Sequence, residues 1–291
     1  MKLKITKNKS SSSSHLKANI DNATVDSFGA EWHKFNQSDL DDEETNTLFN
    51  KYFSFFPWNQ LPPSSEGFDM GCGSGRWANL VALKVGTLNC IDPSKQAIKV
   101  AQATMKDKTN INFINADAES TGLSKLSQDF GYSLGVLHHI PDTSRALQAC
   151  TKLLKPGAPF LLYLYYKFDN RPIWFRYIWR LSELLRYIIS KLPEILKFLI
   201  TDLIAMIIYF PLAKLSNIIE RLGKNPSSIP LSFYRNSSFY TMRTDSRDRF
   251  GTPLEQRFSK KEIIRMMEEA DLHEIKFSSE EPYWVAIGIK N

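Results

Sequence analysis

Residues 68–75 read Phe-Asp-Met-Gly-Cys-Gly-Ser-Gly, a short stretch with Phe68 and Met70 that passes into three alternate glycines. A helical pattern follows at 76–84, so this stretch predicts a buried strand, a tight turn and the start of a helix. Glycines at such a turn allow positive φ values and let a ligand approach the backbone without meeting a Cβ. The N-terminus of the following helix would offer free N–H groups to a carboxylate. The stretch therefore predicts a ligand-binding turn at the end of a strand.

Short apolar runs alternate with helical segments over most of the chain, which is typical of an α/β fold with a parallel sheet and crossover helices. We expect strands at 67–70, 88–91, 111–115, 130–136, 159–166, 273–277 and 284–289. Helices are expected between them, near 76–84, 94–105, 143–154 and 259–270.

Two acidic residues follow the second and third predicted strands. Asp92 can accept hydrogen bonds from both ribose hydroxyls of an adenosine, and Asp117 could hold the adenine amino group. The third glycine comes one residue earlier than in a dinucleotide fingerprint, GxGxxG. Asp69, two residues before the first glycine, would repel a pyrophosphate but attract the ammonium of a methionine moiety. These features favour an adenosine that carries an amino acid over a dinucleotide.

The glycine turn, Asp92, Asp117 and the segment 129–141, in this order, resemble the class I S-adenosylmethionine-dependent methyltransferases over 66–166 and 257–290. The resemblance implies a Rossmann-like, seven-stranded, mostly parallel sheet whose last strand is antiparallel. It implies S-adenosylmethionine as cofactor, with the methionine end near Asp69, Gly71, Gly73 and Gly75 and with Cys72 as a small residue of the same turn. It places Asp92 at the ribose, Asp117 and Ala118 by the adenine, and Gly135 and Val136 beneath the sulfonium.

Two adjacent histidines, His138 and His139, follow the fourth predicted strand and face the expected crevice. Histidine accepts a proton near neutral pH, so either residue is a candidate general base for an acceptor hydroxyl. Members of the family with different chemistries share this His-His-Ile sequence, so the two histidines could instead shape the cofactor pocket, and this alternative stays open. No acidic pair or histidine cluster has metal-ligand spacing, and no metal site is predicted.

Composition divides the chain into four parts. Residues 1–24 form a basic Lys/Ser tail that we expect to be disordered, and 25–65 an N-terminal helical cap. Residues 66–166 and 259–291 form the cofactor-binding domain, and 167–258 a helical insertion between strands 5 and 6, as a lid or acceptor-binding part. An apolar stripe at helical spacing begins the insertion, with Trp174, Ile178, Leu181, Leu185, Ile188 and Leu192.

Prolines divide the rest of the insertion. Pro193 and Pro211 each suit the first turn of a helix, so three consecutive helices are expected. The apolar segment 198–213 is shorter than the roughly 20 residues that span a bilayer. We therefore expect 173–222 to act as a lid that docks on a membrane surface or on a lipidic substrate. Packing of these helices on each other, or on a second subunit in a homodimer, stays open.

Charge is unevenly distributed along the chain. The net charge is +6, of which residues 1–20 carry +5 and 167–224 another +5, so the remainder is acidic. This pattern argues against a nucleic-acid groove and favours an anionic surface such as a membrane. Cys72, Cys90 and Cys150 are scattered, which suits a reducing compartment. With no secretory signal after Met1, we expect a cytoplasmic protein, peripheral to the inner face of a membrane.

These observations predict a methyltransferase that moves a methyl group from S-adenosylmethionine to a small-molecule, glycan or lipid-like acceptor by direct in-line transfer. Two other classes stay open. The first is a nucleotide-dependent oxidoreductase, against which the early third glycine argues. The second is a non-catalytic adaptor that binds a membrane surface through the insertion.

Overall fold

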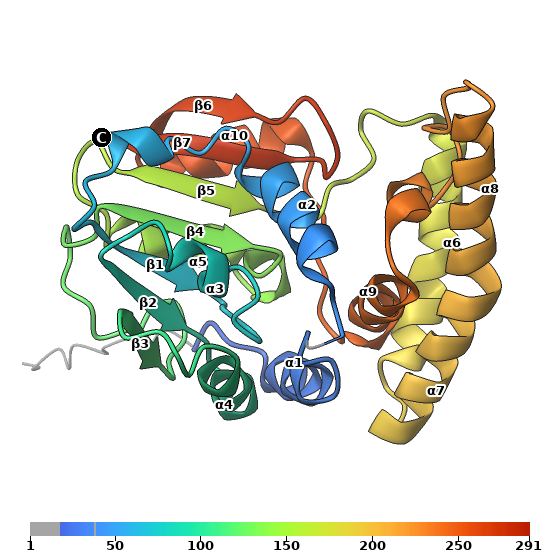
Figure 1. Cartoon of the computed structure of the whole chain (residues 1–291), viewed down its shortest axis with the longest axis horizontal. Helices are drawn as coiled ribbons and strands as arrows, with labels where there is room; N and C mark the ends of the chain where they lie inside the picture. The colour runs from blue at the N-terminus through green and yellow to red at the C-terminus, as the bar shows by residue number, and fades with distance from the viewer. Residues whose placement is uncertain (1–17, 38) are drawn as a thin grey trace, which may run out of the picture.

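The computed structural model describes residues 18–37 and 39–291, which build a seven-stranded sheet with a helical insertion beside it (Figure 1). The strand order is β3-β2-β1-β4-β5-β7-β6. The strands are β1 (Glu66–Met70), β2 (Thr87–Ile91), β3 (Ile111–Ile114), β4 (Phe130–Leu134), β5 (Pro159–Tyr163), β6 (Leu272–Phe277) and β7 (Val285–Lys290). All seven predicted strands are present, with ends shifted by at most three residues.

Strand β1 lies at the point where the order of the sheet reverses. It pairs in parallel with β2 on one side and with β4 on the other, while β7 is antiparallel to both β5 and β6. This confirms the predicted Rossmann-like sheet with an antiparallel last strand. In such open sheets a crevice forms beyond the carboxyl ends of the strands that flank the reversal, here β1 and β4.

Helices cover both faces of the sheet because successive strand residues point to opposite sides. Phe68 and Met70 pack with apolar residues of α5 (Thr143–Thr151) and α10 (Lys260–Glu269). Leu88 and Phe130 pack on the other face with residues of α2 (Asp42–Phe53), α3 (Ala78–Val81) and α4 (Lys95–Thr104). The two cores hold the carboxyl ends of the central strands in fixed positions.

The N-terminal cap begins earlier than the sequence predicts. Helix α1 runs from Asn22 to Lys34, and the Asp21 side chain caps it by accepting a hydrogen bond from the Thr24 N–H at 2.8 Å. The Asn19 side chain makes two hydrogen bonds to the backbone of Asp142. Residues 18–24 are therefore ordered by a cap and a tertiary contact and do not belong to a disordered tail. Residues 1–17 lie outside the described residues.

The insertion leaves the sheet after β5 and returns at Phe258, which pairs with Tyr166 in an isolated parallel bridge. It contains α6 (Ile173–Ile189), α7 (Glu194–Ile204), a π-helical turn η3 (Ala205–Tyr209), α8 (Phe210–Arg221), η4 (Ser232–Asn236) and α9 (Phe239–Gly251). Figure 1 shows α9 between the sheet and an outer layer formed by α6, α7 and α8.

The expected break at Pro211 is absent, because α7, η3 and α8 form one continuous helix from Glu194 to Arg221. The π-helical turn just before Pro211 shifts the regular hydrogen-bond ladder at the place where the proline has no N–H to donate. This helix of 28 residues is, by length and composition alone, long and apolar enough to cross a membrane. The prediction that the segment is too short was therefore wrong.

Candidate active site

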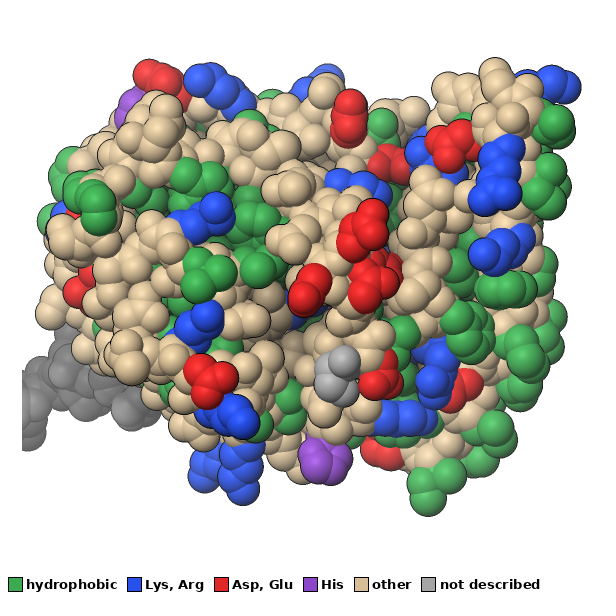
Figure 2. Space-filling view, viewed as in Figure 1, with side chains coloured by type: hydrophobic (Ala, Val, Ile, Leu, Met, Phe, Trp, Pro, Cys, Tyr) green, Lys and Arg blue, Asp and Glu red, His purple; other side chains and the backbone are tan. Residues whose placement is uncertain are grey.

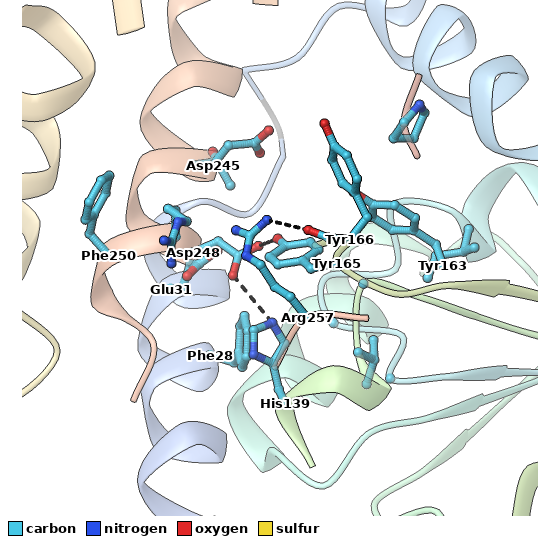
Figure 3. A pocket seen from close by; sticks show the side chains of 18 of the residues that line it. Phe28, Glu31, His139, Tyr163, Tyr165, Tyr166, Asp245, Asp248, Phe250 and Arg257 are labelled. Atoms are coloured by element: carbon cyan, nitrogen blue, oxygen red, sulfur yellow. Dashed lines mark hydrogen bonds and ion pairs between the residues drawn. The ribbon is translucent and has the colours of Figure 1, made fainter. Parts of the chain in front are cut away.

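A cavity of about 680 Å³ lies at the carboxyl ends of β1 and β4, between the sheet, α1 and the insertion. Its volume is within the range of roughly 300–1,000 Å³ that is usual for ligand pockets. The glycine turn and the loops after β2, β3 and β4 form one wall, and aromatic and aliphatic side chains of the insertion form the other. Figure 3 shows the aromatic and acidic side chains that meet there.

The glycine turn forms the floor at one end of this cavity. Gly71 and Gly73 line it together with Cys72, and their φ values are +83° and +54°. A Cβ on Gly73 would stand 2.8 Å from Nε1 of Trp32, so α1 packs directly over the turn. Gly75 does not line the cavity. A Cβ there would stand 2.4 Å from Cε of Met105, so this glycine serves close packing and not ligand contact.

Asp92 holds the glycine turn and also faces the cavity. Its Oδ2 accepts a hydrogen bond from Gly73 N at 3.0 Å, and its Oδ1 accepts one from Ser94 N at 2.8 Å. Burial raises the pKa of Asp92 to about 6, although both hydrogen bonds favour the ionised form. Each oxygen keeps a second lone pair for a ligand hydroxyl.

Four further residues that were predicted to bind the cofactor also line the cavity, whereas Asp69, like Gly75, does not. Asp117 and Ala118 do so after β3, where Asp117 Oδ1 accepts a hydrogen bond from Glu119 N at 2.8 Å. Gly135 and Val136 do so after β4. Gly135 has φ +77°, and apart from its chain neighbours no described residue lies within 4 Å of the position that its Cβ would take, so a ligand can reach this backbone.

Asp69 does not line the cavity, which corrects its expected place at a ligand ammonium. In the parallel pairing of β1 with β4 it stands opposite Tyr132, and it is 3% exposed. Because side chains alternate along a strand, Asp69 points into the core that contains Tyr132 and not along the strand toward the crevice. Burial raises the pKa of Asp69 to about 8, so the carboxyl is mostly neutral at pH 7.

Replacing Asp69 with asparagine is expected to stabilise the protein more at pH 8 than at pH 5. In the unfolded chain the carboxyl has its ordinary pKa of 3.8, but in the folded protein the pKa is about 8, so the aspartate disfavours folding increasingly as the pH rises between these values. Thermal or urea unfolding of both proteins should show a difference in the free energy of unfolding that grows over this interval, by at most about 1.36 kcal/mol per pH unit. A difference that is constant with pH would contradict the neutral carboxyl.

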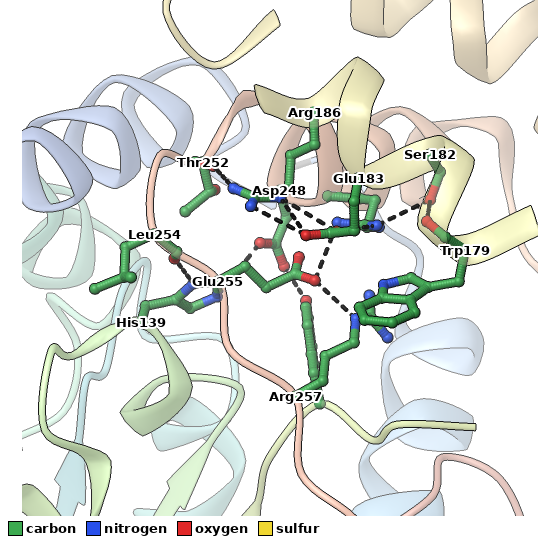
Figure 4. Close-up of polar contacts among 12 residues, drawn as sticks. His139, Trp179, Ser182, Glu183, Arg186, Asp248, Thr252, Leu254, Glu255 and Arg257 are labelled. Carbon is green, nitrogen blue, oxygen red and sulfur yellow. Dashed lines mark hydrogen bonds and ion pairs between the residues drawn. The ribbon is translucent and has the colours of Figure 1, made fainter. Parts of the chain in front are cut away.

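The two histidines occupy different environments. His139 lines the cavity, and its Nδ1 lies 2.6 Å from the Leu254 carbonyl oxygen (Figure 4). A carbonyl only accepts hydrogen bonds, so Nδ1 carries the proton and Nε2 carries the lone pair. Burial lowers the pKa of His139 to about 4. His138 is fully buried, does not line the cavity and packs against Tyr165 with ring centroids 3.9 Å apart and the ring planes tilted by 32°.

Asp248, an acid close to the His139 ring, was not predicted from the sequence. Asp248 of α9 accepts a hydrogen bond from the Tyr165 hydroxyl through Oδ2, and its Oδ1 lies 3.7 Å from Nε2 of His139. Burial raises the pKa of Asp248 to about 7. Glu31 of α1 is also buried at the cavity wall, and neither of its carboxyl oxygens has a hydrogen-bond partner among the described residues.

Burial raises the pKa of Glu31 well above its ordinary value, and the neighbouring Asp248 adds to the rise. Glu31 and Asp248 come from helices more than 200 residues apart, so no local motif could have brought them together. In the sequence, Glu31 is marked only as an acid within a segment rich in aromatic residues, Phe28 to Phe35.

Buried ion pairs fix α9 and the following loop against α6 (Figure 4). The Glu255 side chain is 1% exposed and accepts hydrogen bonds from Arg249 at 3.0 Å and from Arg257 at 2.8 Å. Glu183 pairs with Arg249 and with Arg186, which also donates to the carbonyl oxygens of residues 252 and 253. The loop that carries the Leu254 carbonyl is therefore held in place, and with it the ring of His139.

Comparison with known proteins identifies the domain that carries this site. Residues 68–162 match a family model described as a methyltransferase domain. A ubiquinone biosynthesis O-methyltransferase of Chromobacterium violaceum is 25% identical over 142 residues, which are 48% of this chain and 61% of that protein. One of Paracidovorax citrulli is 35% identical over 92 residues, or 31% of this chain and 39% of that protein.

A solved structure of similar arrangement is a SAM-dependent methyltransferase of Thermotoga maritima. It is 15% identical, and the match covers 91% of this chain and 100% of that chain, with a TM-score of 0.49. The matched part of this chain spans 61% of the length of the first of these two relatives and 39% of the length of the second.

Proposed function

Because this chain belongs to the class I S-adenosylmethionine-dependent methyltransferases, we propose that it transfers a methyl group from S-adenosylmethionine to a hydroxyl of a lipid-like acceptor. The observation that carries this proposal is a single cavity that joins two kinds of wall. Asp92 and the glycine turn lie at one end, and the apolar side chains of the insertion lie at the other.

The chemistry of the first wall fits S-adenosylmethionine. Asp92 would accept hydrogen bonds from the ribose hydroxyls, and Asp117 would accept one from the adenine amino group. The hydroxyl of Ser74, within the glycine turn, is buried at the cavity without a partner among the described residues and would bind the methionine carboxylate. Bound there, the cofactor supplies a methyl group on a sulfonium, which is already an activated leaving group.

The second wall favours an apolar acceptor with a polar end. Phe175, Trp179 and Leu212 line it, with Tyr165 and His139 where it meets the cofactor wall. An acyl or isoprenoid chain would bury apolar surface along the insertion, while its hydroxyl would lie among the polar groups. Both curated relatives carry the name O-methyltransferase, which supports a hydroxyl as the methylated group.

His139 is the proposed general base. Its Nε2 lone pair would accept the acceptor's hydroxyl proton as the new O–CH₃ bond forms and the S–CH₃ bond breaks, the electron pair staying on sulfur. The Leu254 carbonyl fixes the ring, and the Asp248 carboxylate at 3.7 Å would stabilise the imidazolium that results. The helices of the insertion would exclude water from this contact.

Calorimetric titration with S-adenosylhomocysteine, and in parallel with NAD⁺, tests the cofactor. We expect binding of the first and none of the second, and the reverse result would point to an oxidoreductase. Incubation with S-adenosylmethionine labelled in its methyl group, together with a lipid extract or an aqueous metabolite extract, tests the acceptor. Label that enters only water-soluble products would contradict a lipid-like acceptor.

A further inference from the structure

The insertion carries most of the exposed apolar surface of the described residues. Of 23 exposed large apolar side chains there, 20 lie between Ile173 and Leu222. Figure 2 shows such side chains gathered along the edge of the molecule that α7 and α8 form, with lysine and arginine side chains among them. We call the exposed apolar side chains of α6, α7, η3 and α8 the outer face of the insertion. A patch of this size on one set of helices marks an interaction site.

The continuous helix from Glu194 to Arg221 exposes much of its apolar surface to solvent, whereas the apolar stripe of an ordinary surface helix faces the core. Its buried positions are small, polar or amphipathic residues, namely Lys197, Thr201, Ala205, Tyr209, Ala213 and Ser216, and Ile200 and Ile204 are partly buried beside them. Its exposed stripe includes Ile195, Leu199 and Ile207, which are 82%, 56% and 64% exposed. Packing against the rest of the described chain therefore does not account for this exposed apolar stripe.

Charges on the insertion favour an anionic partner. All four carboxylates of residues 173–224 are in ion pairs with arginines or lysines of the described chain: Glu183, Glu194, Asp202 and Glu220. Six exposed cations of the same segment have no carboxylate partner among the described residues: Arg176, Arg180, Lys191, Lys214, Arg221 and Lys224. Each cation near an anionic membrane surface strengthens binding.

The cavity wall continues into this surface. Ile178, Leu181, Leu185 and Ile208 line the cavity and are also exposed members of the outer face. An apolar acceptor could therefore pass between a layer of acyl chains and the cavity without crossing a polar rim at these residues. A second copy of the chain on the same surface would instead cover this part of the cavity wall.

We propose that the outer face docks in the plane of an anionic lipid bilayer and receives the acceptor from it. Delivery of the acceptor rests on the proposed function, whereas docking on the bilayer can be measured without any methyl transfer. The helix lies in the interface and does not span it, because its other side is fixed to α9. There Asp202 pairs with Arg243 at 2.7 Å, and Ser246 Oγ donates to the Thr201 carbonyl at 2.9 Å.

Cosedimentation of the full chain with vesicles tests docking. We expect pelleting with vesicles of equal parts phosphatidylcholine and phosphatidylglycerol, weaker pelleting with phosphatidylcholine alone, and a loss at high salt. The triple variant Ile195→Glu, Leu199→Glu, Ile207→Glu should bind at least tenfold more weakly. The matched control is Leu83→Glu with Leu126→Glu, two side chains 68% and 53% exposed outside the insertion, and it should bind like the original protein.

Quenching of tryptophan fluorescence by brominated acyl chains locates the contact. Trp174 is an exposed member of the outer face, so Trp174→Phe should remove most of the quenching and Trp284→Phe should not. Binding of S-adenosylhomocysteine must be retained in every variant, which separates a failure of docking from a failure of the proposed function. Absence of pelleting, equal pelleting of the triple variant, or a dimer in light scattering that the triple variant dissociates would overturn the proposal.

Discussion

Replacing His139 by alanine is expected to lower kcat about 10²–10⁴-fold and to leave the Kd for S-adenosylhomocysteine unchanged. The substitution removes the Nε2 lone pair, which Leu254 directs by holding the proton on Nδ1. The predicted cofactor contacts come from other residues, at Asp92 and the glycine turn, so cofactor binding should not depend on the imidazole. Steady-state kinetics with the labelled methyl donor, together with calorimetry, separates the two quantities.

His138 provides the matched control. It lies next in the chain and has both ring nitrogens buried, but it does not line the cavity. His138→Ala should therefore lower the free energy of unfolding, by loss of its packing on Tyr165, with a much smaller effect on kcat. If both variants lose cofactor affinity and turnover in parallel, the pair shapes the pocket and His139 is not the base.

The pH profile adds a second test. Because burial lowers the pKa of His139 to about 4, the base is already neutral at pH 5, and its own titration should limit kcat/KM only near pH 4. Asp248 has a pKa of about 7, so its ionisation should raise the rate between pH 6 and 8 by stabilising the imidazolium. Asp248→Asn should remove this rise. A profile governed by a group near pH 6.5 in both proteins would contradict the assignment.

The sheet and the cofactor wall were predictable because their signals are local. Strand β1 has Phe68 and Met70 at alternate positions, and it is followed by glycines with φ values of +83°, +54° and +82°. The acids that follow β2 and β3 come to the same edge because parallel strands place their carboxyl ends together. Alternation along β1 also argues against a cofactor contact for Asp69, because Phe68 and Met70 pack on one face of the sheet and Asp69 must point to the other.

The acceptor side was less predictable because its contacts are not local. Asp248 meets Tyr165 across 83 positions and His139 across 109, and the aspartate lies in a helix with no apolar stripe to show its buried side. Periodicity did group Ile178, Leu181, Leu185 and Ile188 on one side of α6. It could not show that this side would stay exposed, because period alone does not say which stripe of a helix meets the protein.

Replacing Asp92 by alanine is expected to weaken binding of S-adenosylhomocysteine by about 10–150-fold, or roughly 1.5–3 kcal/mol. The change removes the acceptors for two ribose hydroxyls and also frees Gly73 N and Ser94 N, which the carboxylate now holds. Asp92→Asn keeps one oxygen and should lose less. Asp117→Ala is the comparison variant: it removes one proposed contact, to the adenine amino group, and leaves the glycine turn intact because that carboxylate holds only Glu119 N, so it should weaken binding less than Asp92→Ala.

The pH dependence of this affinity distinguishes a ligand contact from a purely structural one. Ribose hydroxyls donate to the ionised carboxylate, and the pKa of Asp92 is about 6 in the free protein, so protonation competes with the ligand. Between pH 8 and 7 the affinity should change little through this group, whereas below pH 6 it should fall by up to about tenfold per pH unit. In Asp92→Asn this fall should be absent. Calorimetry at pH 5, 6 and 7.5 on both proteins measures the difference, and equal slopes would show that Asp92 supports the turn without contacting the ribose.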